Sequence, residues 1–214
     1  MISLMADEIE QMMNDFSALV EAIPPSSKGG AKKGKNSRST VSGHGIEFDS
    51  KEELDFYEWL LEAQEFGFVD GFDDQPETFT LFEGMRNAKG TLLVRPHVYS
   101  PDFLIRFTPK WSEFSAKHKL KAFAKLFPEN GRVYCDVKGG FALHGGSREF
   151  SINQKWMLAK YSIFVHKVEI PKFFTTTWLP EALILTRKTR KLSKRYGGIA
   201  TFDAKYSRIP ADPS

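Results

Sequence analysis

The stretch VYCDVKGG, residues 133–140, places a carboxylate and an ammonium group two positions apart in an otherwise apolar run. Successive side chains of a β-strand point to opposite faces, so Asp136 and Lys138 would share one face of a strand. Their Cα atoms would be about 6.5 Å apart at the rise of a strand. Two interpretations are open: a weak ion pair at the edge of a surface strand, or two groups that reach one small ligand.

A second strand with an aspartate is expected at SPDFLIRF, residues 100–107. Pro101 would stand at the strand start, where its missing N–H does least harm. The apolar residues that follow alternate on one face and leave Asp102 on the other. If this strand lies beside the strand of Asp136, the two carboxylates could share a divalent cation, because Mg²⁺ binds one or two carboxylates together with waters and substrate phosphate.

A glutamate opens the first expected helix, DSKEELDFYEWLLEAQEFG, residues 49–67. Asp49 or Ser50 would be its N-cap and Gly67 its stop. Glu53 heads the largely apolar face of this helix, which should look toward the sheet. Ser50 and Glu53 also match the S-x-x-E capping box, so a capping role and a role in the site are both open.

The order of helices and strands predicts an α/β fold with a mixed central sheet. The insert at 108–132 would be helical over about 112–127. The remaining expected elements are a strand at 45–48, strand-like runs around 77–83, 91–99 and 102–107, the strand at 133–138, a helix over about 151–161 and a strand over 162–170.

Composition divides the chain into four parts. Residues 1–23 repeat apolar positions every three or four residues, which indicates a helix that either forms a homodimer or packs on its own domain. Residues 24–44 are rich in Pro, Gly, Ser and Lys and read as a flexible basic linker. We expect the main domain over 45–181 and a basic C-terminal tail over 182–214.

Two stretches contain basic residues and no acidic ones, 24–44 and 187–195, on either side of the middle of the chain. Basic arms around a centre with carboxylates suit a protein that binds DNA, although solvated tails would look the same. The candidate DNA-binding residues in these parts are Lys32, Lys33, Lys35, Arg187, Lys188, Arg190 and Lys191.

Targeting signals are not evident in the sequence. No apolar stretch approaches the length of a membrane span, the acidic N-terminus does not resemble a signal peptide, and Cys135 is the single cysteine. We therefore expect a cytoplasmic protein without a membrane partner.

A helix glutamate followed by P-D and then by D-x-K resembles the pattern of the PD-(D/E)XK nuclease superfamily. More narrowly, GIEFDSKEE, SPDFLI and DVKGG are similar to phage-encoded members that are related in layout to Holliday junction resolving enzymes. The resemblance covers about residues 45–170. It implies a restriction-endonuclease-like core and hydrolysis of DNA phosphodiester bonds with Mg²⁺ or Mn²⁺ as cofactor.

The resemblance also assigns roles to five residues. Asp102 and Asp136 would be metal ligands, Glu53 would be a further ligand or would orient one, and the carbonyl of Val137 would complete the metal site. Lys138 would position the attacking water or help to deprotonate it. The aspartate at 136, where glutamate is commoner, is an accepted variant of the pattern.

Members of the superfamily often carry a Gln or Lys on the helix after the D-x-K strand, where it contacts the site or a phosphate. Gln154 and Lys155 occupy the matching positions here. Two other interpretations stay open: a solvent-facing polar pair, or a capping box formed by Ser151 and Gln154.

The sequence therefore predicts a metal-dependent endonuclease that acts on DNA, most specifically on branched DNA, as a homodimer. A homodimer would place two sites to cut both strands of a junction. The alternatives are a less selective phage nuclease that cuts duplex or single-stranded DNA, and a DNA-binding module without catalysis.

Overall fold

The computed structural model describes residues 40–124, 130–139 and 146–207. The chain divides after Ser37, and all described residues belong to the unit Arg38–Ser214. The expected helix at 1–23 and the candidate DNA-binding residues Lys32, Lys33 and Lys35 lie outside the described residues.

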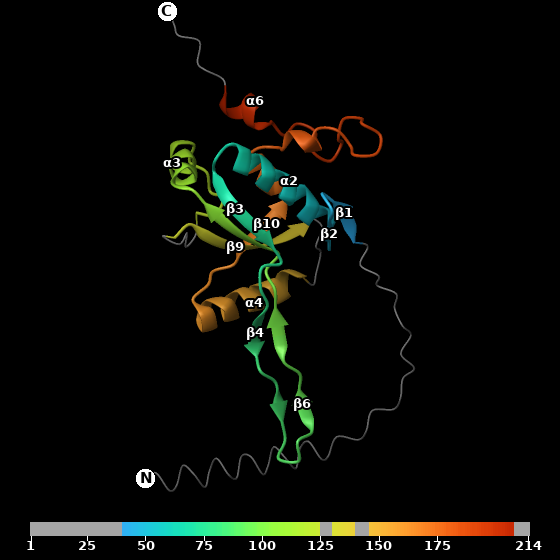
Figure 1. Ribbon diagram of the computed structural model, residues 1–214, viewed down its shortest axis with the longest axis vertical. Helices are drawn as coiled ribbons and strands as arrows, with labels where there is room; N and C mark the ends of the chain where they lie inside the picture. The colour runs from blue at the N-terminus through green and yellow to red at the C-terminus, as the bar shows by residue number, and fades with distance from the viewer. Residues whose placement is uncertain (1–39, 125–129, 140–145, 208–214) are drawn as a thin grey trace, which may run out of the picture. The chain divides into compact units, whose positions relative to one another are not determined.

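A four-stranded sheet forms the centre of this unit, in the order β10-β9-β8-β3 (Figure 1). The strands β9 and β10 are parallel, whereas β8 is antiparallel to both β9 and β3. This confirms the predicted α/β class with a mixed central sheet. The bounds of the strands are Val69–Asp74 for β3, Phe103–Phe107 for β8, Arg132–Gly139 for β9 and His166–Ile170 for β10.

Helices cover the two faces of the sheet. The helix α2, Lys51–Glu65, lies on one face and α4, Gly146–Tyr161, on the other (Figure 1). Along β8 the buried side chains alternate accordingly, with Ile105 packed in the core under α2 and Leu104 in a smaller core under α4. This alternation fixes which face of each strand carries the aspartates.

The helix α2 is held by an aromatic interior. Phe56 and Trp59 are fully buried, and their rings stack with centroids 5.7 Å apart. The helix ends at the cap Phe66, and Gly67 follows in the left-handed region with φ +70°. The predicted stop is therefore confirmed, because glycine adopts this conformation without a steric penalty.

A two-stranded ribbon leaves the sheet between β3 and β8 (Figure 1). Its base pairs β4, Phe79–Phe82, with β7, His97–Tyr99, and its outer part pairs β5, Met85–Arg86, with β6, Leu92–Val94. The predicted strand at 91–99 is interrupted at Pro96, which has no N–H to donate.

The folded unit begins earlier than the predicted boundary at residue 45. The strand β1, Val41–Gly43, pairs with β2, Ile46–Phe48, in a hairpin that contacts α2. The end of the predicted linker at 44 is therefore wrong, because the hairpin turn lies at residues that the composition assigned to the linker.

The bounds of two helices and the start of one strand, β10, also differ from the prediction. The helix in the insert, α3, spans Pro109–Lys117 and ends before Lys119, whose φ is +51°. The helix α4 begins at Gly146 instead of 151, so Ser151 lies inside it and does not cap it. Ser162, with φ +57°, separates α4 from β10.

The described part of the predicted C-terminal tail, residues 182–207, is packed on the domain, so the prediction of a tail is wrong for these residues. After α5, Lys172–Thr176, a 3-10 helix η1, Glu181–Leu183, and the helix α6, Phe202–Tyr206, follow. Tyr196 is buried in the core under α2. Among the described residues, no helix is both long enough and apolar enough to cross a membrane.

Candidate active site

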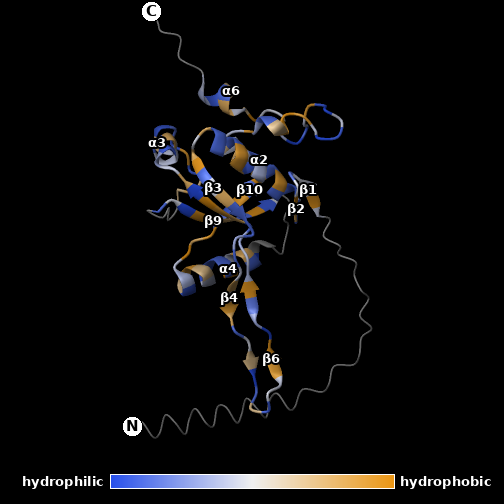
Figure 2. Ribbon diagram, viewed as in Figure 1, coloured by the Kyte–Doolittle hydropathy of each residue, from blue (hydrophilic) through white to orange (hydrophobic). Residues whose placement is uncertain are grey.

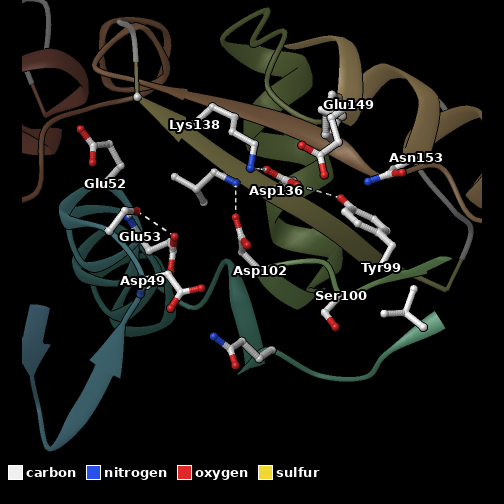
Figure 3. A pocket seen from close by; sticks show the side chains of 16 residues that line it. Asp49, Glu52, Glu53, Tyr99, Ser100, Asp102, Asp136, Lys138, Glu149 and Asn153 are labelled. Atoms are coloured by element: carbon white, nitrogen blue, oxygen red, sulfur yellow. Dashed lines mark hydrogen bonds and ion pairs between the residues drawn. The ribbon is translucent and has the colours of Figure 1, made fainter. Parts of the chain in front are cut away.

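A cavity of about 580 Å³ opens where the start of β8, the middle of β9, the first turn of α2 and the base of the ribbon meet (Figure 3). Polar side chains dominate its wall. The lining residues are Asp49, Ser50, Glu52, Glu53, Gln75, Val98, Tyr99, Ser100, Asp102, Asp136, Val137, Lys138, Gly139, Glu149, Phe150 and Asn153.

Asp102 and Asp136 meet at this cavity because β8 and β9 are neighbours. Phe103 lies opposite Cys135 in the antiparallel register, so the residues just outside this pair, Asp102 and Asp136, come together. Asp102 Oδ2 accepts a hydrogen bond from the backbone N–H of Val137 at 2.6 Å. The predicted juxtaposition of the two carboxylates on neighbouring strands is thus present.

Asp136 is almost fully buried, with 3% of its surface exposed. Its Oδ2 accepts a hydrogen bond from the hydroxyl of Tyr99 at 2.8 Å. Its Oδ1 forms an ion pair with Nζ of Lys138 but accepts no well-directed hydrogen bond among the described residues. Lys138 therefore lies within the site and is not at a solvent-facing strand edge.

Glu53 reaches the cavity wall and forms the capping box as well. The Ser50 hydroxyl donates to Glu53 Oε1 at 2.8 Å, and the Glu53 backbone N–H donates to Ser50 Oγ at 3.2 Å. The backbone N–H of Asp49 donates to Glu53 Oε2 at 3.0 Å. Both interpretations of Glu53 are compatible because these bonds leave lone pairs on both oxygens.

Burial and mutual repulsion shape the electrostatics of the site. Burial, followed by the charges of Asp136 and Glu53, raises the pKa of Asp102 to about 8. Burial also raises the pKa of Glu53. Burial alone would lower the pKa of Lys138, but the carboxylates of Asp136, Asp102 and Glu53 raise it overall. The cavity thus gathers several carboxyl groups around one ammonium group, so ionising all of them together is unfavourable without a further cation.

The donor set fits a hard divalent cation. Two carboxylates from adjacent strands match the oxygen ligands that Mg²⁺ and Mn²⁺ prefer, and buried Asp136 Oδ1 has the Lys138 ammonium group as its only partner among the described residues. No three His, Cys, Asp or Glu side chains of the described segments already surround one metal position. Glu53 accordingly suits an orienting role better than a third direct ligand, since its cap holds it at the helix end.

Among the lining residues that were not predicted from the sequence, three have polar side chains that face the aspartates or their neighbours. Tyr99 comes from β7 and bonds Asp136, while Glu149 and Asn153 come from α4. The Glu149 carboxylate points toward Lys138 and Asp136 (Figure 3). The spacing of 149 and 153 places them on one helix face, a signal that was hidden because the helix was expected to begin only at 151.

The structure turns Gln154 and Lys155 away from this cavity. Gln154 Nε2 donates to the carbonyl of Val165 at 2.6 Å, which ties α4 to the start of β10. Lys155 is exposed and lines a different depression together with Trp156. Neither residue lines the cavity, because the helix presents Glu149 and Asn153 there instead; a contact of exposed Lys155 with a DNA phosphate stays a prediction.

Arg187 binds protein carboxylates, which does not match a free DNA-binding cation. Its Nη1 donates to Asp55 at 3.1 Å and its Nη2 to Glu58 at 3.2 Å, both on α2. The other candidates of this block are exposed and lie outside the cavity; they are Lys188, Arg190 and Lys191. Arg195, which follows them in the chain, pairs with Glu52 on the cavity wall.

Comparison with known proteins gives one family. A family model described as "Protein of unknown function (DUF1064)" matches residues 31–142, which is more than half of the chain and includes Glu53, Asp102, Asp136 and Lys138. No curated protein and no solved structure matches the chain. By the extent of this match, the chain belongs to the DUF1064 family.

Proposed function

We propose that this protein is a metal-dependent DNA endonuclease with a restriction-endonuclease-like core of the PD-(D/E)XK type. One observation carries the proposal: Asp102, Asp136 and Lys138 converge on one polar cavity from two adjacent strands. The order of these residues in the sequence and their position at one end of neighbouring strands both suit phosphodiester hydrolysis assisted by a cation.

Asp102 and Asp136 would hold Mg²⁺ or Mn²⁺ together with the carbonyl of Val137, and Glu53 would orient this ligand set. The bound cation would neutralise charge that develops on the phosphate and lower the pKa of a bound water. Two buried carboxylates this close are costly to ionise even with Lys138 beside them, and burial together with the charge of Asp136 raises the pKa of Asp102.

The side chains of the chain itself prepare the site. The Tyr99 hydroxyl and the Val137 N–H hold the two aspartates in place through hydrogen bonds of 2.8 and 2.6 Å. Lys138 has a raised pKa and stays protonated near neutral pH, so it suits orienting the attacking water or a phosphate oxygen better than removing a proton.

The finer proposal is a preference for branched DNA, cut by a homodimer. The similarity to the Holliday junction resolving layout supports it, as does the apolar repeat at residues 1–23, which suits pairing of two chains. Two sites related by two-fold symmetry could cut two strands of a four-way junction. Exposed Lys188, Arg190 and Lys191 are available for phosphates.

The test is cleavage of end-labelled four-way junction, flap, duplex and single strand in Mg²⁺, in Mn²⁺ and in EDTA. Asp136→Asn is the matched variant because it keeps the side-chain size and removes the charge. We expect junction cleavage that EDTA abolishes and that the variant reduces by at least about 10²-fold.

The outcomes separate the alternatives. Equal cleavage of all four substrates would retain the nuclease and discard the branch preference. DNA binding without cleavage in either metal would overturn the proposal and leave a DNA-binding module.

A further inference from the structure

The outer part of the ribbon, residues 84–95, is here called the ribbon tip. It exposes a run of large apolar side chains, and Figure 2 shows this hydrophobic stretch on β6. Leu93 is 55% exposed and Val94 48%. The exposed apolar residues of the tip are Met85, Leu92, Leu93 and Val94.

The ribbon tip does not serve the core. Consecutive residues of β6 are exposed, so neither face of this pair is packed against the domain. An isolated two-stranded ribbon in water is marginally stable at best, so such an extension needs a reason other than the stability of the fold.

The turn at the end of the tip is nevertheless well built. Asn87 Oδ1 accepts hydrogen bonds from the backbone N–H groups of Lys89 at 3.0 Å and Thr91 at 2.9 Å. Arg86 Nη1 donates to the carbonyl of Gly90 at 2.9 Å. These bonds organise the tip before any partner binds, which lowers the entropic cost of binding.

Basic and acidic residues occupy different parts of the ribbon. The tip contains Arg86, Lys89 and Arg95 and no acidic residue. No ion pair within the described residues involves these three cations. The acidic residues nearer the base have partners, since Glu77 accepts a hydrogen bond from Tyr134 and Glu83 pairs with Lys160 at 3.6 Å.

The ribbon is continuous with the candidate active site. Tyr99, at the end of β7, lines the cavity, and His97 Nε2 lies 2.7 Å from Oδ1 of Asn153, another lining residue. From Tyr99 to Thr91 the strand spans at most about 26 Å at the rise of a β-strand. That length corresponds to about 8 base pairs of stacked duplex, at about 3.4 Å per pair.

We propose that the ribbon tip binds duplex DNA up to about 8 base pairs from the cleaved phosphate. The inference rests on the proposed function and adds where the substrate is held. A two-stranded ribbon fits the major groove, where Lys89 and Arg95 reach flanking phosphates and the apolar side chains contact base methyl groups. The unpaired positive charge and the apolar surface together match this partner.

The experiment measures DNA binding by the full chain in EDTA, so it does not depend on catalysis. The variant is Lys89→Glu with Arg95→Glu; Arg86 is left intact because it holds the turn. The charge-matched control is Lys117→Glu with Lys121→Glu, two exposed lysines of the insert. The probes are four-way junctions with arms of about 4 or about 16 base pairs, which fall short of and exceed the reach of the ribbon.

We expect the tip variant to bind the long-armed junction about tenfold or more weakly than the wild type, and its salt dependence to lose a slope of about 2, since each phosphate contact contributes about 0.9. The wild type should bind the short-armed junction more weakly than the long-armed one, and the tip variant should bind both alike. The control should retain the arm-length dependence.

Equal weakening by both double variants would mean a net-charge effect and would overturn the inference. A further variant, Leu93→Ser, tests the apolar surface of the tip. If this variant binds DNA as tightly as the wild type but no longer forms a dimer in sedimentation, the tip serves self-association and the inference is overturned. If the wild type binds with the expected dependence on arm length and on the tip residues but never cleaves DNA, the proposed nuclease activity is overturned and the ribbon remains a DNA-binding element. The failure of the further inference and the failure of the proposed function are therefore distinguishable.

Discussion

Two basic extensions of the same domain differ in how their charge is used. In the C-terminal segment, Arg187 and Arg195 pair with carboxylates of α2 and fasten the segment over that helix. In the ribbon tip, Lys89 and Arg95 take part in no ion pair within the described residues. In sequence, the C-terminal block is the more basic of the two.

A run of basic residues in the sequence is therefore no measure of the positive charge that the folded protein keeps free of ion pairs. Asp55 is fully buried at the centre of the C-terminal network, where it accepts hydrogen bonds from Tyr196 and Arg187. Such an arrangement stabilises the fold, and the arginines in it are no longer free to bind a ligand. The ribbon tip has the smaller charge but keeps it available.

The largest effect on stability is expected from a substitution of Asp55, the central carboxylate of the C-terminal network. Asp55→Ala should lower the free energy of unfolding by about 3 kcal/mol, because it leaves the buried Tyr196 hydroxyl without its acceptor and removes one of the carboxylate partners of each of two arginines. Urea unfolding followed by tryptophan fluorescence measures it.

The control Asp55→Asn keeps an acceptor and should cost less, about 1 kcal/mol. Burial raises the pKa of Asp55, so the folded protein loses less with an uncharged side chain here than the ion pairs alone would suggest. An alanine variant as stable as the wild type would contradict the structural role of the network.

The pH dependence of the unfolding free energy reports on the packed domain and not on the ribbon tip, because the tip has no Asp, Glu or His. Burial lowers the pKa of His166, on β10, from 6.5 to about 4. The folded state therefore disfavours the protonated ring: the stabilisation is complete above pH 6.5 and is lost as the pH falls toward 4. Between pH 7 and 5 this loss amounts to about 2 kcal/mol.

His166→Gln removes the titrating group at similar size. Its unfolding free energy should change less between pH 7 and 5 than that of the wild type, by about 2 kcal/mol. Parallel pH curves for the two proteins would show that His166 is not the source.

The smallest effect on stability is expected in the ribbon tip. Leu93 is 55% exposed, whereas Leu104 of β8 is 3% exposed. Leu93→Ala should change the unfolding free energy by less than about 0.5 kcal/mol, while Leu104→Ala, the same change in a buried position, should cost about 3 kcal/mol. A large loss for Leu93→Ala would mean that the tip is part of the folding core after all.

Local patterns predicted the parts of the site that lie on regular elements. The alternation around Asp102 and Asp136 and the capping pattern at Ser50 and Glu53 depend on residues close in sequence, and the structure has both. The meeting of the two aspartates needed only that β8 and β9 be neighbours.

The remaining features depend on contacts between distant residues, which local patterns do not encode. The strand β3 has a polar sequence and was missed; its register against β8 is supported by the pair of Arg106 with Asp73. Tyr99 reaches Asp136 only because the ribbon returns to the sheet. The C-terminal block was read as a tail because its carboxylate partners lie on α2, far away in sequence.

The proposed function requires that Asp102 and Asp136 together hold a divalent cation. Titration of Mn²⁺ into the full chain, followed by electron paramagnetic resonance, tests it most directly, with Asp136→Asn as the variant and Glu169→Gln as a control whose carboxylate lies outside the cavity. We expect the wild type and the control to bind Mn²⁺ alike and Asp136→Asn to bind it at least about tenfold more weakly. Equal affinity in all three proteins would contradict the account.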